Sequence, residues 1–158
     1  MAHELEIVNG NAQMAYVGDV PWHGLGTKVP ADLTPEQFMV KAGLDWTVEK
    51  EDILTRSGIK VKNKQALVRS SDGSILDVVG TGWNPVQNSE AFNFFEEYVN
   101  AGDMEMHTAG SLKDGQMVWA LAKTKDSFEL FNGDQTDNYF LFTNPHQFGK
   151  AINIRMTP

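Results

Sequence analysis

The dipeptide Asp72-Gly73 lies between two runs rich in β-branched and aliphatic residues, 59–69 and 75–81. An Asp-Gly pair flanked by such runs is the strongest short-range signal for a β-hairpin, because its residues tolerate the backbone angles that a tight turn needs. A second turn signal, Ser57-Gly58, separates 59–69 from the preceding run 46–55. These signals predict three consecutive strands that pair antiparallel, over 46–55, 59–69 and 75–81.

Two segments carry helix signals. Thr34, Pro35 and Gln37 form a capping box with proline at the first helical position, which predicts a helix over 34–42. Ser89 is expected to cap a second helix that continues to about Asn100. The apolar residues of the second helix recur at helical spacing and predict a face that packs on a sheet: Ala91, Phe92, Phe95, Tyr98 and Val99.

The rest of the chain reads as short strands. We expect them over 104–109, 117–123, 127–131, 139–144 and 151–156. Strands follow one another directly, without a repeating alternation of strand and helix, and this order is typical of antiparallel sheets. The predicted fold class is therefore α+β, with a mainly antiparallel sheet, a β-β-β-α core and additional C-terminal strands.

Residues 1–33 are predicted to form an N-terminal arm, because glycine and proline interrupt every candidate period. Within the arm, Trp22 lies in the string Pro21-Trp22-His23-Gly24-Leu25-Gly26 and is expected to anchor it on the core. Residues 34–158 are predicted to form a single α+β domain. The strand-like run that ends the chain suggests the N-terminal part of a longer parent.

Composition narrows the classes of function. The chain has 158 residues, 41% of them hydrophobic and 22% charged, which is typical of one folded domain. It has no cysteine, which excludes disulfides, thiolate zinc sites and a cysteine nucleophile. No apolar run approaches the roughly 18 residues of a membrane span, so we expect no membrane association and a cytoplasmic location.

The sequence carries no recognisable catalytic motif. It lacks a P-loop, a nucleophile elbow and a zincin helix, and its four histidines are scattered one to a region. We therefore predict a protein that is not an enzyme, with no catalytic residues, no metal site and no cofactor. A hydrolase or nuclease centred on unrecognised carboxylates remains an alternative. Its candidate residues are Asp72, Asp77, Asp114, Asp126, Asp134 and Asp137.

The clearest functional signal is a cluster of cations in an acidic chain. The formal net charge is -8, yet residues 50–69 carry six Lys/Arg against two Asp/Glu, a local balance of +4. A local positive field favours polyanions such as nucleic acid. The predicted nucleic-acid-binding residues are Arg56, Lys60, Lys62, Lys64 and Arg69. The three lysines alternate, so an extended strand projects them from one face. The alternative interpretation is that they protect an exposed sheet edge.

Single-strand binders add aromatic surfaces on which bases stack. Trp46 and Trp83 flank the basic unit in the sequence and are candidates for stacking, with burial in the core as the alternative for each. The leading prediction is a non-enzymatic protein that binds single-stranded DNA along a basic hairpin. The alternative is a protein-interaction or assembly module, which is supported by the acidic remainder of the chain.

Several strings resemble a family of phage and plasmid-like proteins catalogued as a domain of unknown function. They are Pro21-Trp22-His23-Gly24-Leu25-Gly26, Gly43-Leu44-Asp45-Trp46-Thr47-Val48, the Asp72-Gly73 hairpin, Val79-Gly80-Thr81-Gly82-Trp83 and Glu90-Ala91-Phe92. The order helix, three strands, helix is also similar to the single-strand annealing superfamily with the Redβ, RecT and Erf types.

This resemblance implies a bent hairpin sheet packed on a long helix, and subunits that assemble into rings or filaments. It implies that the five basic residues line a groove for the DNA backbone while bases stay exposed for pairing. It further implies recombination by strand annealing, a homo-oligomer, the cytoplasm of an infected bacterial host as the location, and a phage or host protein as an additional partner.

Overall fold

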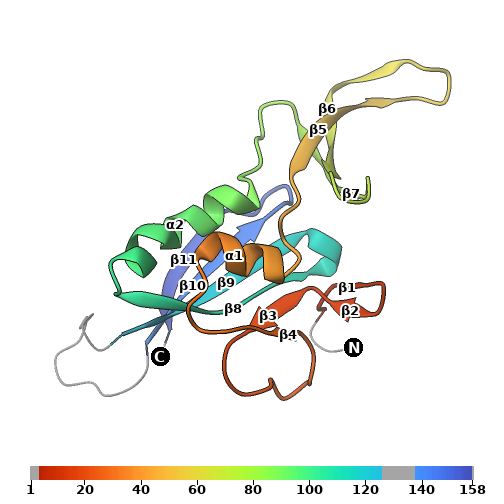
Figure 1. The fold of residues 1–158 in the computed structure, drawn as a ribbon. Helices are drawn as coiled ribbons and strands as arrows, with labels where there is room; N and C mark the ends of the chain where they lie inside the picture. The colour runs from red at the N-terminus through yellow and green to blue at the C-terminus, as the bar shows by residue number, and fades with distance from the viewer. Residues whose placement is uncertain (1–3, 126–137, 158) are drawn as a thin grey trace.

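The computed structural model describes residues 4–125 and 138–157. Its largest element is a six-stranded sheet with the strand order β11-β10-β9-β8-β3-β4, in which every neighbouring pair is antiparallel except β3 and β4 (Figure 1). The strands are β3 (Met14–Tyr16), β4 (Thr27–Lys28), β8 (Met104–Leu112), β9 (Met117–Thr124), β10 (Tyr139–Pro145) and β11 (Asn153–Thr157). Helices α1 (Pro35–Lys41) and α2 (Asn88–Asn100) lie together on one face of this sheet.

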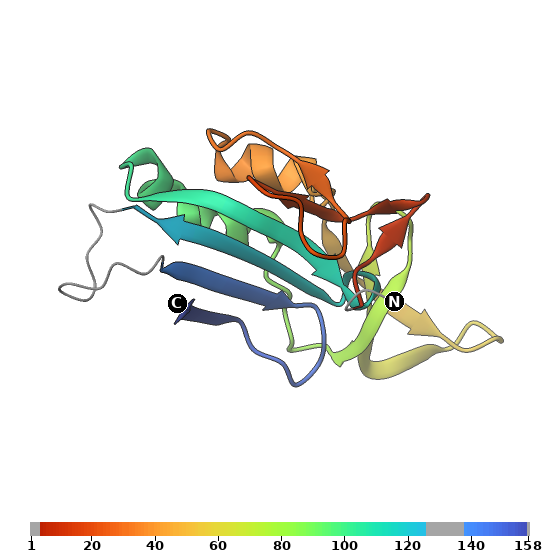
Figure 2. The same cartoon turned by 90° about the horizontal axis from the view of Figure 1, so that it is seen from below.

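A second, three-stranded sheet projects away from this body (Figures 1 and 2). It consists of β5 (Val48–Leu54), β6 (Lys60–Arg69) and β7 (Ile75–Gly80), paired antiparallel in the order β5-β6-β7. The three predicted strands and both turns between them are confirmed. A small hairpin of β1 (Ile7–Val8) and β2 (Asn11–Ala12) and a 3-10 turn over Lys113–Gly115 complete the described elements.

Local signals place both helices correctly. The Thr34 hydroxyl accepts a hydrogen bond from the Gln37 N–H at 3.1 Å, and the Gln37 side chain accepts from the Thr34 N–H at 2.9 Å, so the predicted capping box is present. The second helix is capped by Gln87 rather than by Ser89, and without a side-chain hydrogen bond. It ends at Asn100, as predicted, and Gly102 follows with a φ of 81°, the left-handed conformation that glycine accepts after a helix end.

The hydrophobic core lies between the helices and the six-stranded sheet. Its fully buried aromatic residues are Phe38 of α1 and Phe92 and Phe95 of α2, which pack with Met104 and Met106 of β8. Helix α2 packs mainly against α1 and strands β8, β9 and β10. The family resemblance predicted instead a hairpin sheet packed on this helix. The aromatic face of α2 is confirmed, but the sheet it covers is the six-stranded one.

The N-terminal segment differs from an irregular arm. All three residues of strand β3 are buried: its backbone pairs with β8 and β4, and Ala15 belongs to the core on the helix side of the sheet. The prediction for Trp22 is wrong: the residue is 79% exposed in the loop between β3 and β4. The signal for an anchor was the apolar pair Trp22 and Leu25 between glycines, and the loop leaves the indole exposed.

Across the described residues, two α-helices and eleven strands form mainly antiparallel sheets, which confirms the α+β class. The four predicted C-terminal strands other than 127–131 are confirmed as β8 to β11. The strand predicted over 127–131 lies outside the described residues. No helix in the described part of the chain is long and apolar enough to cross a lipid bilayer.

Candidate nucleic-acid interface

The distal half of the β5–β6 hairpin, residues 53–64, carries four cations and no carboxylate. Among the described residues, it projects farthest from the body (Figure 1). We call these residues the basic tip. Since the whole chain has a formal charge of -8, the rest of the molecule carries -12, and the charge is strongly polarised toward one end. Such a polarised field orients a polyanion toward the tip.

Strand pairing is irregular at the basic tip. On the proximal side Asp52 pairs with Gln65, and on the distal side Leu54 pairs with Lys60, so residues 61–64 bulge opposite the single residue 53. Asn63, inside the bulge, has a φ of 62°. The simple alternation predicted for the three lysines is therefore interrupted, because a bulge bends its strand and redirects the side chains that follow.

The four cations of the basic tip are all exposed, and they differ in their contacts. Arg56 lies in the turn and Lys62 in β6, both exposed. Lys60 forms an ion pair with Asp52 at 3.5 Å, and both side chains are largely exposed. Exposed pairs of this kind contribute at most about 1 kcal/mol, so a phosphate can compete for the lysine. Lys64 holds its Nζ 5.9 Å from the centre of the Phe148 ring.

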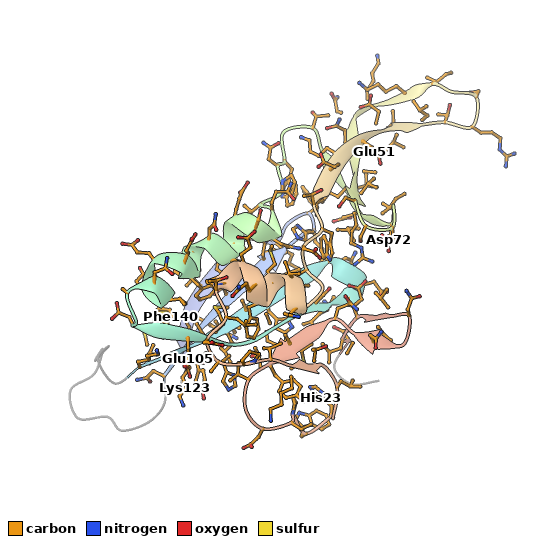
Figure 3. The ribbon with its side chains drawn as sticks, in the orientation of Figure 1. His23, Glu51, Asp72, Glu105, Lys123 and Phe140 are labelled. Carbon is orange, nitrogen blue, oxygen red and sulfur yellow. The ribbon has the colours of Figure 1, made fainter. Side chains whose placement is uncertain are left out.

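Arg69 does not belong to this surface, and its predicted role is corrected. Its side chain is buried at the base of the projecting sheet, where Nη1 donates to Glu6 Oε1 at 2.8 Å. Nε and Nη2 donate to the two carboxylate oxygens of Asp72 at 3.1 and 2.8 Å. Figure 3 shows Asp72 at the junction between the projecting sheet and the body. Both acids neutralise the guanidinium, so Arg69 ties the hairpin to the body.

The same cluster shifts the titration of Asp72. Hydrogen bonds from the Arg69 guanidinium, and then from the backbone N–H and hydroxyl of Ser74, lower the pKa of Asp72 below its ordinary value. Asp72 therefore stays ionised at any ordinary pH and holds both Arg69 and the turn that follows β6. Its role is structural. Asp72, one of the candidate residues of the alternative hydrolase or nuclease centre, is thus engaged in an ion pair with Arg69.

The two candidate stacking residues also lie elsewhere. Trp46 is 8% exposed, with the Arg69 guanidinium 5.2 Å from its ring and the His146 ring packed edge-on at 5.5 Å. It is a core residue, as the alternative interpretation expected. Trp83 is half-buried against the core, and its carbonyl accepts a hydrogen bond from Lys50 Nζ at 3.0 Å.

Lys50 contributes to the sequence-level positive balance but not to the exposed surface. Its Nζ also donates to the carbonyl of Thr81 at 2.7 Å and to Oδ1 of Asn84 at 3.2 Å. Together with the bond to Trp83, these contacts hold the loop that connects β7 to α2. Within residues 50–69, the exposed cations are therefore those of the basic tip.

One functional candidate was missed by sequence reasoning. Phe148, in the loop between β10 and β11, is 64% exposed and stands beside Lys64. Its backbone N–H donates to Asp77 Oδ2 at 2.6 Å, which fixes the loop against β7. An exposed aromatic ring next to an exposed lysine is the pair of features that single-strand binding requires. Because residues 64 and 148 are far apart in the chain, no local pattern brings them together.

The described residues contain no group of three or more His, Asp or Glu side chains that is placed to hold a metal ion. His146 is buried, and its Nε2 lies 3.0 Å from Asn88 Oδ1. Since Asn88 Nδ2 donates to the Leu44 carbonyl at 3.0 Å, Oδ1 accepts, and His146 carries its proton on Nε2. Burial lowers the pKa of His146 to about 4, so it is neutral at pH 7. This histidine is a structural element of the core.

No curated protein and no solved structure matches the chain. The family model described as "Domain of unknown function (DUF932)" matches residues 75–158, which run from β7 through β11 and make up more than half of the chain. The protein therefore belongs to the DUF932 family of domains of unknown function.

Proposed function

We propose that this protein binds single-stranded DNA, without catalysis, through the basic tip and Phe148. The observation that carries the proposal is the contact between Lys64 and the exposed Phe148 ring, on a projecting hairpin whose distal residues carry four cations and no acid. Phosphates lie along Arg56, Lys60 and Lys62, and a base stacks on Phe148. The sequence-tolerant chemistry of both contacts suits a binder without strong sequence preference.

The finer parts of the proposal rest on the family resemblance. The element order α1, β5, β6, β7, α2 resembles that of the single-strand annealing proteins, and this resemblance supports strand annealing in recombination as the use of the bound DNA. A phage origin, action in the cytoplasm of an infected bacterium and assembly into a homo-oligomer belong to the same proposal.

The proposal is tested by fluorescence anisotropy with a labelled single-stranded oligonucleotide at several salt concentrations. Each neutralised phosphate contributes a slope of about -0.7 to the plot of log affinity against log salt, so three or four contacts give a slope of about -2 to -3. The double variant Lys62→Glu/Lys64→Glu should lose binding. Phe148→Ala should weaken binding by about 1–3 kcal/mol and leave the salt slope unchanged, because a stacked base carries no counterion.

A charge-matched control separates local contacts from net charge. Lys28 and Lys41 are exposed and lie on β4 and α1, away from the hairpin, so Lys28→Glu/Lys41→Glu changes the net charge by the same amount. This control should retain most of the affinity, and Lys62→Arg/Lys64→Arg should retain nearly all of it. Absence of binding by the wild-type protein at about 50 mM salt would end the proposal, because phosphate contacts are strongest at low salt.

A second candidate function is docking onto a phage or host protein. The specific observation is that Leu54 and Ile59, which flank the hairpin turn, are 59% and 66% exposed. Exposed aliphatic side chains at a projecting tip are typical of protein contacts. If the tip binds protein, Leu54→Ser/Ile59→Ser should abolish the biological activity while the two lysine reversals leave it intact. The DNA proposal predicts the opposite sensitivity.

A further inference from the structure

The face of the six-stranded sheet opposite the helices carries an apolar pocket of about 350 Å³. Its lining comes mainly from β3, β8, β9 and β10, and Leu5 and His23 complete it. Within β9, Val118 and Ala120 belong to the helix-side core, so the intervening Trp119 points to the opposite face. The lining residues from these strands are Met14, Leu112, Met117, Trp119, Leu141 and Thr143.

Trp119 gives this pocket a flat wall. A Cβ atom added to Gly110 on the neighbouring strand would lie only 3.0 Å from Cζ2 of the indole, so the ring lies directly against the backbone of β8. A larger residue here would require the indole and the Gln13 carbonyl to shift by a few tenths of an ångström. One side of the indole is thereby packed on the sheet, and the aliphatic neighbours complete a hole suited to a large apolar group.

A large apolar group stands next to the hole. Trp22 is 79% exposed, and the ring of the adjacent His23, which itself lines the pocket, contacts the indole edge-on at 5.4 Å. His23 is fixed because its Nδ1 accepts a hydrogen bond from the Leu25 N–H at 3.0 Å. Figure 3 shows His23 in the loop between β3 and β4, on the side of the molecule away from the projecting sheet. Val20, in the same loop, is 61% exposed.

We propose that the pocket receives Trp22 of a second copy of this chain, while its own Trp22 enters the pocket of that copy. A protrusion and a matching hole on one surface patch make the patch self-complementary, which is the condition for a twofold-symmetric dimer. Tryptophan is largely buried in most proteins, and it is among the residues that dominate binding energy at interfaces. This inference is independent of the proposed DNA binding.

The size of the contact sets the strength of the dimer. Each indole buries about 150–250 Å², and each pocket covers a comparable area, so the reciprocal contact buries roughly 600–1,000 Å² in total. Stable interfaces bury about 1,200–2,000 Å², so the dimer is weak and depends on concentration. Because each copy carries a formal charge of -8, the two copies repel, and added salt strengthens the dimer. DNA binding responds to salt in the opposite direction.

Analytical ultracentrifugation from about 1 µM to about 1 mM tests the dimer, a range that brackets a weak association. The wild-type protein should dimerise, with tighter association at higher salt. Trp22→Ala removes the protrusion, and Thr143→Phe fills the hole, so each variant alone should associate at least about thirtyfold more weakly. Val40→Ala removes an apolar side chain that is 49% exposed on α1, and it should leave association unchanged.

A mixture of the two variants is the decisive measurement. The Trp22→Ala chain keeps its hole and the Thr143→Phe chain keeps its protrusion, so an equimolar mixture should recover part of the association through one contact for each dimer. Tryptophan emission should shift to shorter wavelength as the wild-type dimer forms. A monomer at every concentration, a dimer that persists in Trp22→Ala, or a mixture that recovers nothing would each overturn the inference.

Discussion

Replacing Arg69 with methionine should destabilise the protein strongly. The Arg69 side chain is 5% exposed, and that of its partner Glu6 is 3% exposed. Methionine has a similar volume and fills the space beside Trp46, so the main effect of the substitution on stability is electrostatic. Glu6 loses its guanidinium and keeps only the hydrogen bond from the Ser111 hydroxyl at 3.0 Å. Breaking a buried ion pair on one side leaves an uncompensated charge and costs about 3–5 kcal/mol.

The structure divides this cost between the two acids. The Asp72 side chain is 49% exposed, so water solvates its carboxylate once Arg69 is removed. The buried carboxylate of Glu6 is not solvated in this way, and it carries most of the penalty. The single variant Glu6→Gln keeps an acceptor for Ser111 and leaves Arg69 bound to Asp72, so its cost is about 1–3 kcal/mol. The double variant should be at least about 1 kcal/mol more stable than the sum of the single costs predicts.

Urea unfolding of the wild type, both single variants and the double variant measures these free energies in one cycle. If Arg69→Met costs less than about 1 kcal/mol, or if the two costs add without coupling, the buried pair is not what holds the hairpin to the body. The same folded Arg69→Met protein should retain its affinity for single-stranded DNA, because Arg69 is not exposed. A large loss of affinity would restore Arg69 to the binding surface.

Three further predictions concern stability, each measured by urea unfolding. Burial lowers the pKa of His146 from 6.5 to about 4, so between these pH values the unfolded chain binds a proton at this residue and the folded chain does not. The free energy of unfolding should therefore have its full value above pH 6.5 and fall by about 3 kcal/mol toward pH 4. His146→Gln should lose this pH dependence. Gly110→Ala places a methyl group against Trp119 and should cost about 1–3 kcal/mol, whereas an unchanged stability would mean that the indole moves freely. Thr34→Ala removes the acceptor for the Gln37 N–H and should cost about 1 kcal/mol, while Thr34→Ser should cost little.

Local signals in the sequence are sufficient for much of the fold. The capping box at Thr34 and the turn signal at Asp72-Gly73 depend only on residues a few positions apart, and both appear as expected. In the hairpin, Gly73 has a φ of 72° and Asp72 accepts hydrogen bonds from Ser74, which are the properties for which these residue types are favoured in turns. The cations of 56–64 also stay together, because one hairpin carries them all.

The membership of the candidate site depends on contacts that no local pattern encodes. Arg69 lies in the same basic stretch of sequence as the other cations, yet it is buried in an ion pair with Glu6, which lies just before β1 and is distant in the chain. Phe148 joins the site because the loop after β10 docks on Asp77. The periodicity of apolar residues also fails to predict β3, because its three residues are too few to show a pattern. Its place in the sheet depends on pairing with β8 and β4, which are distant in the chain or separated from it by a loop.

The amino-acid sequence alone determined the α+β class, the order of the main elements and the presence of a positively charged hairpin in a negatively charged protein. Each of these follows from residues that are close together in the chain. The tertiary structure alone decided which cations face solvent, which tryptophans are buried and which aromatic ring stands beside a lysine. Burial and ion pairing depend on which distant segments meet, and that is settled only when the whole chain packs around one core.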